Sequence, residues 1–342
     1  MTRWTFAAFL LLNIILFGCD RSEPIVVIQL HPKNPEILYI TTNEYIYKSR
    51  DGGRTWANIS KGMSHSRVIS MAVDPSYPAT VYAGTKGDAV YKSYDGGQRW
   101  ASMRSGLDDA TISSVVNQFV FDPYDNNHIF VATTMGIFET KNGGGSWTKR
   151  MEGMKEVLMV VTLGMDPTRP AILYAGTSGG VYKTVNEGAQ WEKVNNGLVP
   201  PEIIKSSRAL NVTSIHVDPF QPETVYAATL AGLFKTTDGA KSWVRIAETL
   251  SDQMIIAMIL DRSKNGVIYI AGRDGVHRSD DGGMTWRTLN RGLASTNIRS
   301  IVQSPVDSDL LYAGTNGSGL YRSRDRGESW EPMPSITHRA GS

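Results

Sequence analysis

The chain has 342 residues, a formal net charge of +2 and an ordinary globular composition, with 41% hydrophobic and 20% charged residues. This composition excludes a disordered chain and a collagen-like fibre, and the near-neutral charge without a basic run argues against a nucleic-acid-binding protein. Cysteine occurs once, at Cys19, which excludes an intrachain disulfide framework and a cysteine-based zinc cluster.

The N-terminal residues are typical of an export signal. Arg3 supplies the positively charged start, and an apolar run extends from Phe6 to Phe17. This run is too short to span a membrane comfortably. We therefore expect the rest of the chain to lie outside the cytoplasm.

The apolar run ends in Leu16-Phe17-Gly18-Cys19, a tetrapeptide that resembles the bacterial lipobox. The resemblance implies a lipoprotein-type signal peptide at 1–18, lipidation of Cys19 and a tether at 19–24 that anchors the protein to an extracytoplasmic membrane surface, facing the periplasm or the cell exterior. A cleaved signal without a lipid and an uncleaved anchor are the alternatives.

From residue 25 onward, one order of predicted elements recurs. An apolar run such as Val68–Val73 predicts a first strand, and a turn rich in proline follows it at 74–78. Two short alternating segments, Val81–Thr85 and Val90–Ser93, predict the second and third strands around a glycine-bearing loop. The stretch after the next tryptophan, which ends in Gly-Leu or Gly-Met, predicts a fourth strand.

An octet that ends in tryptophan closes the third segment of every repeat. The first octet is Ser-Arg-Asp-Gly-Gly-Arg-Thr-Trp at 49–56, and successive tryptophans lie 44, 47, 44, 52, 43 and 44 residues apart. An Asp or Asn oxygen that accepts backbone N–H groups, followed by glycine at positive φ, predicts a hairpin turn, and the indole can then pack on a neighbouring unit. The positions concerned are Asp51, Trp56, Asp95, Trp100, Asn142, Trp147, Asn186, Trp191, Asp238, Trp243, Asp281, Trp286, Asp325 and Trp330.

These octets resemble the Asp-box, or BNR, repeat, with the pattern Ser/Thr-x-Asp-x-Gly-x-x-Trp. Four strands in about 45 residues form a propeller blade. The sequence therefore predicts an all-β chain with a single seven-bladed β-propeller of four-stranded antiparallel blades at 25–335 and a C-terminal tail at 336–342. Blade one is expected to pack on blade seven without a shared strand. Ala240 replaces a glycine in the fifth octet, which predicts strain or a changed turn.

No catalytic constellation stands out in the sequence. The Asp-box carboxylates are expected to be structural and to lie on the face opposite the functional loops. The Asp-box family includes sialidases and xyloglucanases, so a carbohydrate-active hydrolase is the alternative function. The sialidase triplet Arg-Ile-Pro is missing, because Ala247 follows Arg245-Ile246, and xyloglucanases of this repeat type use two propellers. Acidic residues expected on the functional face are Asp88, Asp108, Asp109, Glu156, Glu202 and Asp252, with Asp88 and Asp109 on neighbouring loops.

The histidines show no metal-ligand spacing, so neither a metal nor another cofactor is predicted. His216 occupies the inner-strand position that Ala72 holds in another repeat. We expect it to face the axial channel or to be a core histidine with its hydrogen bonds satisfied.

Among Asp-box proteins, the sequence resembles the photosystem II assembly and stability factors and their non-photosynthetic relatives, which are exported, often lipidated propellers. Sortilin-type receptors share the repeat more distantly. The resemblance implies a non-enzymatic interaction or assembly factor whose client is a membrane protein or membrane complex. The 52-residue interval contains an inserted loop at 200–208, and loops can carry function. We predict a basic rim that binds this client, formed by Arg67, Lys205, Arg208, Arg273 and Arg299.

Overall fold

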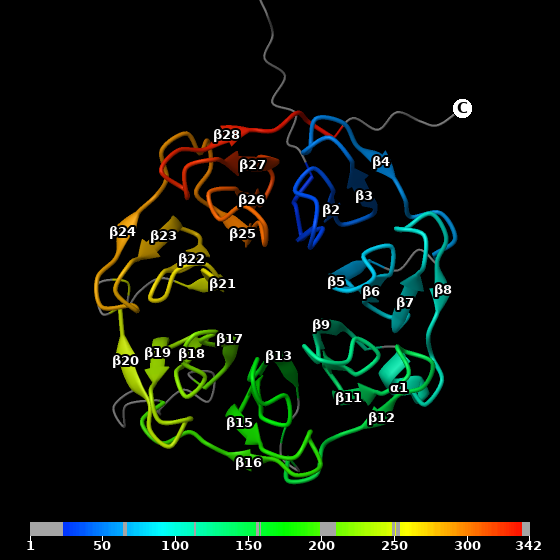
Figure 1. Cartoon of the computed structure of the whole chain (residues 1–342), viewed down its shortest axis with the longest axis vertical. Coiled ribbons are helices and arrows are strands. Elements are labelled where there is room, and N and C mark those ends of the chain that lie inside the picture. Colours follow the sequence, from blue (N-terminus) through cyan, green and yellow to red (C-terminus); the bar gives the residue numbers. More distant parts are fainter. Residues whose placement is uncertain are drawn as a thin grey trace, which may run out of the picture.

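Seven four-stranded antiparallel sheets form a closed ring around a central axis in the computed structural model of the chain (Figure 1). The structure describes residues 23–63, 67–112, 114–154, 157, 159–198, 210–247, 250 and 254–336. Within every sheet the strands follow one another in sequence order, from the channel to the outer edge. The predicted seven-bladed, all-β propeller is therefore confirmed.

The strands of each blade are named by their distance from the axis. The inner strands are β1 (Val27–Leu30), β5 (Val68–Val73), β9 (Val116–Phe121), β13 (Val160–Met165), β17 (Val212–Val217), β21 (Ile255–Leu260) and β25 (Ile298–Gln303). The second strands are β2 (Leu38–Thr41), β6 (Val81–Thr85), β10 (Ile129–Thr133), β14 (Leu173–Thr177), β18 (Val225–Thr229), β22 (Ile268–Gly272) and β26 (Leu311–Thr315).

The third strands are β3 (Ile46–Ser49), β7 (Val90–Ser93), β11 (Gly136–Thr140), β15 (Gly180–Thr184), β19 (Gly232–Thr236), β23 (Gly275–Ser279) and β27 (Leu320–Ser323). The outer strands are β4 (Ala57–Asn58), β8 (Ala101–Ser102), β12 (Thr148–Lys149), β16 (Glu192–Lys193), β20 (Val244–Ile246), β24 (Arg287–Thr288) and β28 (Glu331–Pro332). The outer strands are shorter than expected from the stretch after each tryptophan. One short helix, α1 (Asp109–Ile112), precedes β9, and within the described residues no helix is long and apolar enough to cross a membrane.

The hydrophobic core lies between the blades. Second strands such as β14 are buried along their whole length, because neighbouring blades cover both faces of each sheet. One core cluster joins Tyr174 of blade 4 to Val212 and Ile215 of blade 5. Gly176 shows how close the blades approach, since a Cβ atom there would lie 2.7 Å from Cγ1 of Val212. Burial between blades explains the nearly continuous apolar character of the second strands.

The Asp-box octets fold as predicted. In the first octet, Asp51 Oδ1 accepts a hydrogen bond from the N–H of Thr55 at 2.9 Å, and Ser49 Oγ accepts one from the N–H of Gly53 at 2.8 Å. The hydrogen bonds from Thr55 lower the pKa of Asp51 to about 2. Ala240 adopts a positive φ of 72° yet keeps the hydrogen bond from its N–H to Thr236 Oγ1. Strain is therefore present at Ala240, and the turn is unchanged.

Each Asp box also joins neighbouring blades. The indole Nε1 of Trp191 donates to the backbone oxygen of Arg150 in the preceding blade at 3.1 Å, and Trp100, Trp147, Trp243 and Trp330 do the same in their blades. A lysine on the third strand of one blade also donates to a backbone oxygen in the Asp box of the following blade. An example is Lys183 Nζ, which lies 2.8 Å from the Gly239 oxygen. The octets thus connect neighbouring blades by hydrogen bonds. This structural role is enough to explain why they recur in every blade.

Blade 7 closes the ring against blade 1 by side-chain packing, with no strand shared between them (Figure 1). Leu310 and Tyr312 of blade 7 pack with Ile28 and Leu38 of blade 1, and Ile336, which was expected to begin the tail, packs against the same cluster. The Tyr312 hydroxyl donates to the backbone oxygen of Gly52, in the first Asp box. Closure therefore resembles the other junctions in its apolar packing and its tyrosine hydrogen bond, but it lacks the indole hydrogen bond, because Trp56 Nε1 has no partner in the described structure.

Candidate functional site

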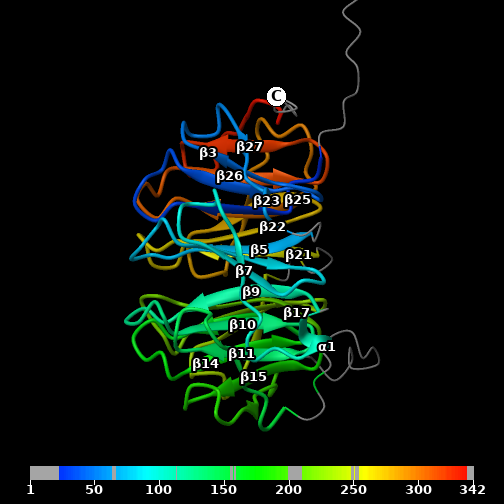
Figure 2. The ribbon, with the colours of Figure 1, turned by 90° about the vertical axis from the view of Figure 1, so that its right-hand side faces the viewer.

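The loops that enter the inner strands and the loops between second and third strands share one face, which we call the entry face. Helix α1 marks this face at the right of Figure 2. Backbone hydrogen bonds join the two kinds of loop, as between Lys86 N–H and the Arg67 oxygen at 2.8 Å and between Asn316 N–H and the Asn297 oxygen at 2.9 Å. The Asp boxes lie at the opposite ends of the third strands, so the predicted separation of the two faces is present.

Three arginines of the predicted rim lie on the entry face, in blades 2, 6 and 7. Arg273 is exposed in the turn between β22 and β23, and Arg299 is exposed on β25, where its Nη1 donates to Asn316 Oδ1 at 3.1 Å. Arg67 precedes β5 and is half-buried, and its Nε is buried without a hydrogen-bond partner in the described structure. Lys205 and Arg208 lie outside the described residues.

Two of the acidic residues predicted on the entry face, Asp88 and Asp108, are engaged in local structure. Asp88 is buried and bound by the Tyr91 hydroxyl and by Arg104. Asp108 caps α1, because its Oδ1 accepts the N–H of Thr111 at 2.7 Å, and hydrogen bonds from Thr111 lower the pKa of Asp108. Asp109 is exposed. Glu156, Glu202 and Asp252 lie outside the described residues.

Asp88 and Asp109 occupy neighbouring segments, as predicted. The N–H of Gly87 donates to the backbone oxygen of Ser114 at 2.9 Å, and the N–H of Ala89 donates to that of Ile112 at 3.1 Å. The two carboxylates differ in their surroundings, because Asp88 is buried and paired with Arg104 whereas Asp109 is exposed.

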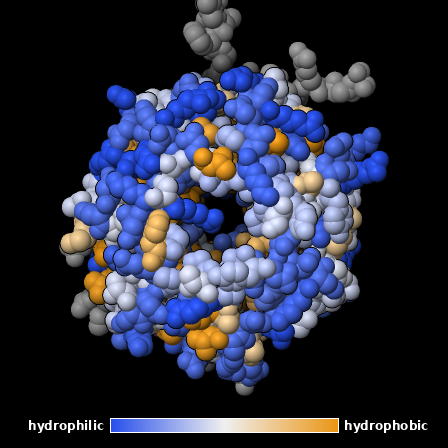
Figure 3. Space-filling view, in the orientation of Figure 1, coloured by the Kyte–Doolittle hydropathy of each residue, from blue (hydrophilic) through white to orange (hydrophobic). Residues whose placement is uncertain are grey.

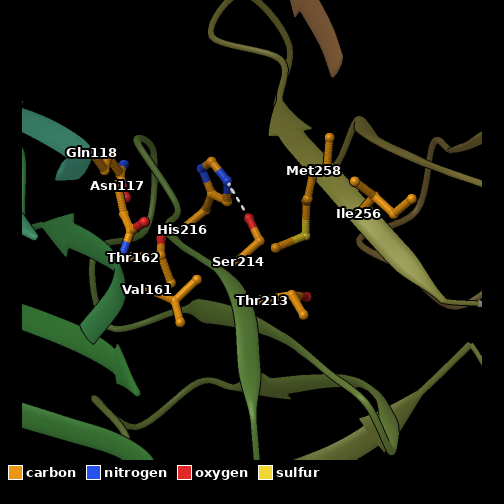
Figure 4. A pocket seen from close by; sticks show the side chains of 10 residues that line it. Asn117, Gln118, Val161, Thr162, Thr213, Ser214, His216, Ile256 and Met258 are labelled. Carbon is orange, nitrogen blue, oxygen red and sulfur yellow. Dashed lines mark hydrogen bonds between the residues drawn. The ribbon is translucent and has the colours of Figure 1, made fainter. Parts of the chain in front are cut away.

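A pocket of about 310 Å³ opens in the wall of the axial channel, and the space-filling view shows the channel itself as an opening in a mostly hydrophilic face (Figures 3 and 4). It is lined by residues of β9, β13, β17 and β21. His216 projects into it, with Nε2 at 3.0 Å from Ser214 Oγ. Burial, and then the charge of Arg262, lower the pKa of His216 to about 4, so its imidazole is neutral near pH 7. Of the two positions expected for His216, the structure shows the one that faces the channel.

A second cluster, which the sequence reasoning missed, joins blades 3 and 4 on the Asp-box face. His128 is buried, with Nδ1 at 3.0 Å from Asp122 and Nε2 at 2.8 Å from Glu139. Ligand atoms of His128, Glu139 and Glu187 lie within 4.8 Å of one another. The Lys141 Nζ already binds this group, at 2.8 Å from Glu187 and 3.5 Å from Glu139.

We interpret this second cluster as an ion-pair network, because both ring nitrogens of His128 are engaged and an ammonium group holds the two glutamates together. One sequence signal could have revealed it. Glu139 stands where Lys48, Lys92 and Lys183 stand in other blades, and a buried carboxylate at that position requires new cationic partners.

Comparisons with known proteins agree with this fold. Residues 43–162 match the family model described as "Sortilin, neurotensin receptor 3". A segment of 123 residues is 24% identical to a xyloglucanase of Hypocrea jecorina and corresponds to 34% of this chain and 15% of that protein. Among solved structures, an ancestral GH74 enzyme superposes with a TM-score of 0.75 at 19% identity, over 92% of this chain and 47% of the enzyme.

A further solved structure matches the chain over nearly the whole length of both proteins. YCF48 bound to D1 peptide superposes with a TM-score of 0.65 at 17% identity and covers 94% of each chain. The resemblance to Asp-box propellers of the sortilin, xyloglucanase and YCF48 types is therefore confirmed at the level of fold. This chain spans about half of the GH74 enzyme and a much smaller part of the curated xyloglucanase.

Proposed function

We propose that this protein is a membrane-tethered, extracytoplasmic interaction factor that binds an extended segment of a protein client on its entry face, in the manner of a membrane-complex assembly or stability factor. The observation that carries the proposal is Arg67, whose buried Nε has no hydrogen-bond partner in the described structure. An unsatisfied buried donor is costly, and a carboxylate or backbone carbonyl of a bound segment would satisfy it.

Two features support a protein client. Arg273 and Arg299 are exposed on the same face, and arginine pairs readily with carboxylates and backbone carbonyls at protein interfaces. The YCF48 structure that matches 94% of this chain holds a peptide, which fits a propeller of this size used for binding. Of the acids expected on this face, Asp88 is already paired with Arg104 and Asp108 caps α1, so binding is favoured over a hydrolase.

The test is capture of the client from solubilised membranes by wild-type protein and by the double variant Arg208→Glu/Arg299→Glu. We expect capture to be lost with an unchanged melting temperature, because Arg299 is exposed and Arg208 falls in the loop predicted from the sequence. Arg99→Glu, at an exposed position in an Asp box on the opposite face, is the matched control and should capture normally. Undiminished capture by the double variant, or release of reducing ends from xyloglucan by wild-type protein, would overturn the proposal.

The membrane tether is tested separately. If Cys19 carries the lipid, the mature protein partitions into detergent and Cys19→Ser abolishes that partitioning or leaves the precursor uncleaved. Mass spectrometry that finds an unmodified N-terminus downstream of Cys19 would remove the anchor from the proposal and leave client binding untouched.

A further inference from the structure

The channel pocket is lined entirely by uncharged side chains. Six of them carry hydrogen-bonding groups, and four are apolar. The polar residues are Asn117, Gln118, Thr162, Thr213, Ser214 and His216, and the apolar residues are Val161, Ile256, Ala257 and Met258. An ionic ligand would find no counter-charge among them, so this lining suits a neutral ligand.

Several of the polar side chains are held in place by hydrogen bonds between neighbouring blades. The Nδ2 of Asn117 donates to the Val160 oxygen at 2.7 Å, and the Oε1 of Gln118 accepts the N–H of Leu163 at 2.8 Å. Each amide therefore uses one end to join β9 to β13. The other ends, Oδ1 of Asn117 and Nε2 of Gln118, have no hydrogen-bond partner among the described residues, which leaves one acceptor and one donor for a ligand.

His216 is fixed in the same way. A backbone hydrogen bond to Met258 on the next blade holds one side of the ring, and Ser214 Oγ lies beside Nε2 (Figure 4). A Ser–His pair invites comparison with a nucleophile and its base. A base works best when its pKa is near the working pH, and burial lowers the pKa of His216 to about 4, which makes it a poor base at neutral pH. The pair is better suited to hydrogen bonding than to catalysis.

The apolar residues complete a two-sided pocket. Ile256 and Met258 lie on β21, across the pocket from Asn117 and Gln118 on β9 (Figure 4). A sugar ring matches this arrangement, since its hydroxyls both donate and accept while its C–H groups pack on aliphatic side chains. The volume of about 310 Å³ falls at the lower end of the range for small-ligand pockets.

We propose that the channel pocket binds a small neutral polyhydroxylated ligand, one sugar ring in size. The pocket residues are different from the arginines assigned to the client site, so the two proposals can be tested independently. Protein side chains that end in a carboxamide share part of this chemistry, and the experiment below distinguishes them from sugars.

The test is saturation-transfer NMR on the full-length protein with glucose, galactose and xylose as neutral probes, and with glucuronate as the charged counterpart of glucose. We expect binding of at least one neutral sugar, and weaker binding of glucuronate than of glucose. Gln118→Leu keeps the side-chain size and removes the donor, so it should weaken the bound sugar about tenfold, which corresponds to the loss of one good hydrogen bond. Thr162→Val is the second variant should Gln118→Leu lower the melting temperature.

Arg299→Glu provides the control that separates the two sites. It should leave the sugar signal unchanged even where client capture is lost, whereas Gln118→Leu should leave client capture unchanged. The proposal is overturned when none of the three neutral sugars shows transfer, when glucuronate binds as well as glucose, or when sugar binding persists in folded Gln118→Leu and Thr162→Val proteins. Binding of acetamide in the absence of sugar binding would also overturn it, because the pocket would then recognise a carboxamide.

Discussion

The seven Asp-box indoles differ in how deeply they are buried. Trp191 is 1% exposed and donates to the preceding blade, whereas Trp56 and Trp286 are half-buried. Trp286 donates only within its own octet, and Trp56 Nε1 has no partner in the described structure. Trp56 and Trp286 therefore pack against core clusters as partly buried side chains, unlike the buried indole of Trp191.

This difference in burial predicts unequal losses of stability. Trp191→Ala should lower the free energy of unfolding by about 3 to 5 kcal/mol, since it leaves a large cavity. Trp56→Ala should cost clearly less, because its indole is already in contact with solvent. Denaturant unfolding of the two variants measures both values. Equal losses would mean that exposure in the native ring does not govern the contribution of these indoles.

Ala240 predicts a stabilising substitution. It holds a positive φ of 72°, which is unfavourable for a residue with a Cβ atom, so Ala240→Gly should raise the free energy of unfolding by about 1 kcal/mol. Gly144→Ala is the mirror experiment. Its φ is 92° and the nearest atom to an added Cβ lies at 3.5 Å, so backbone strain and not crowding should lower stability by a similar amount. In thermal and denaturant unfolding, the midpoint should rise for Ala240→Gly and fall for Gly144→Ala.

At the level of strands and turns, the contribution to stability of each lysine that bridges two blades can be tested by a single substitution. Lys183 Nζ donates to the Gly239 oxygen of the next blade at 2.8 Å and lies 5.4 Å from the centre of the Tyr174 ring. Lys183→Met keeps the aliphatic stem and removes the charged donor, which should cost about 1 to 2 kcal/mol of unfolding free energy. Lys193→Met, on the exposed outer strand β16, should cause no measurable loss. Equal behaviour of the two variants would show that the lysine bridge contributes nothing.

The strand pattern could be predicted from the sequence because the repeat imposes both hydrophobic alternation and turn chemistry. The features that differ from blade to blade could not be predicted in this way. Glu139 replaces a lysine that bridges blades elsewhere, and its partners are His128, just before β10, and Arg150, just after β12, so their meeting depends on three-dimensional packing. The channel pocket could not be predicted from the sequence for a similar reason. Asn117, Thr162 and His216 are scattered over three consecutive blades, and only the packing of these blades around the channel brings them together.

For the whole molecule, the cluster at the junction of blades 3 and 4 predicts a pH-dependent stability. Hydrogen bonding to Glu139 raises the pKa of His128 above its ordinary value of 6.5, although burial opposes the shift. A raised histidine pKa stabilises the fold below pH 6.5, and this contribution is lost as pH rises through the folded value. Burial favours a higher pKa for Glu139, but hydrogen bonds from His128 and Arg150 lower it to about 2, so its contribution is lost as pH falls from 4.5 towards 2.

Unfolding of wild-type protein and of His128→Gln over a pH series measures this effect. The difference in unfolding free energy between the two proteins should be largest near pH 5 to 6 and should shrink above the raised pKa of His128. A difference that is constant from pH 5 to 9 would show that His128 stabilises the junction without its charge.

Blades 7 and 1 meet without sharing a strand, and this has a consequence for the order in which the blades are synthesised and packed. On the ribosome, the flank of blade 1 that carries Ile28 and Leu38 appears early, and the residues that cover it, Leu310 and Tyr312, are synthesised last. Each later blade finds its neighbour already present, whereas blade 1 waits through the synthesis of the whole ring with an apolar side exposed to water. During synthesis, the apolar side of blade 1 therefore stays uncovered until blade 7 packs on it. Because apolar clusters join the blades at the other junctions as well, circular permutation would transfer this exposed side to whichever blade is made first.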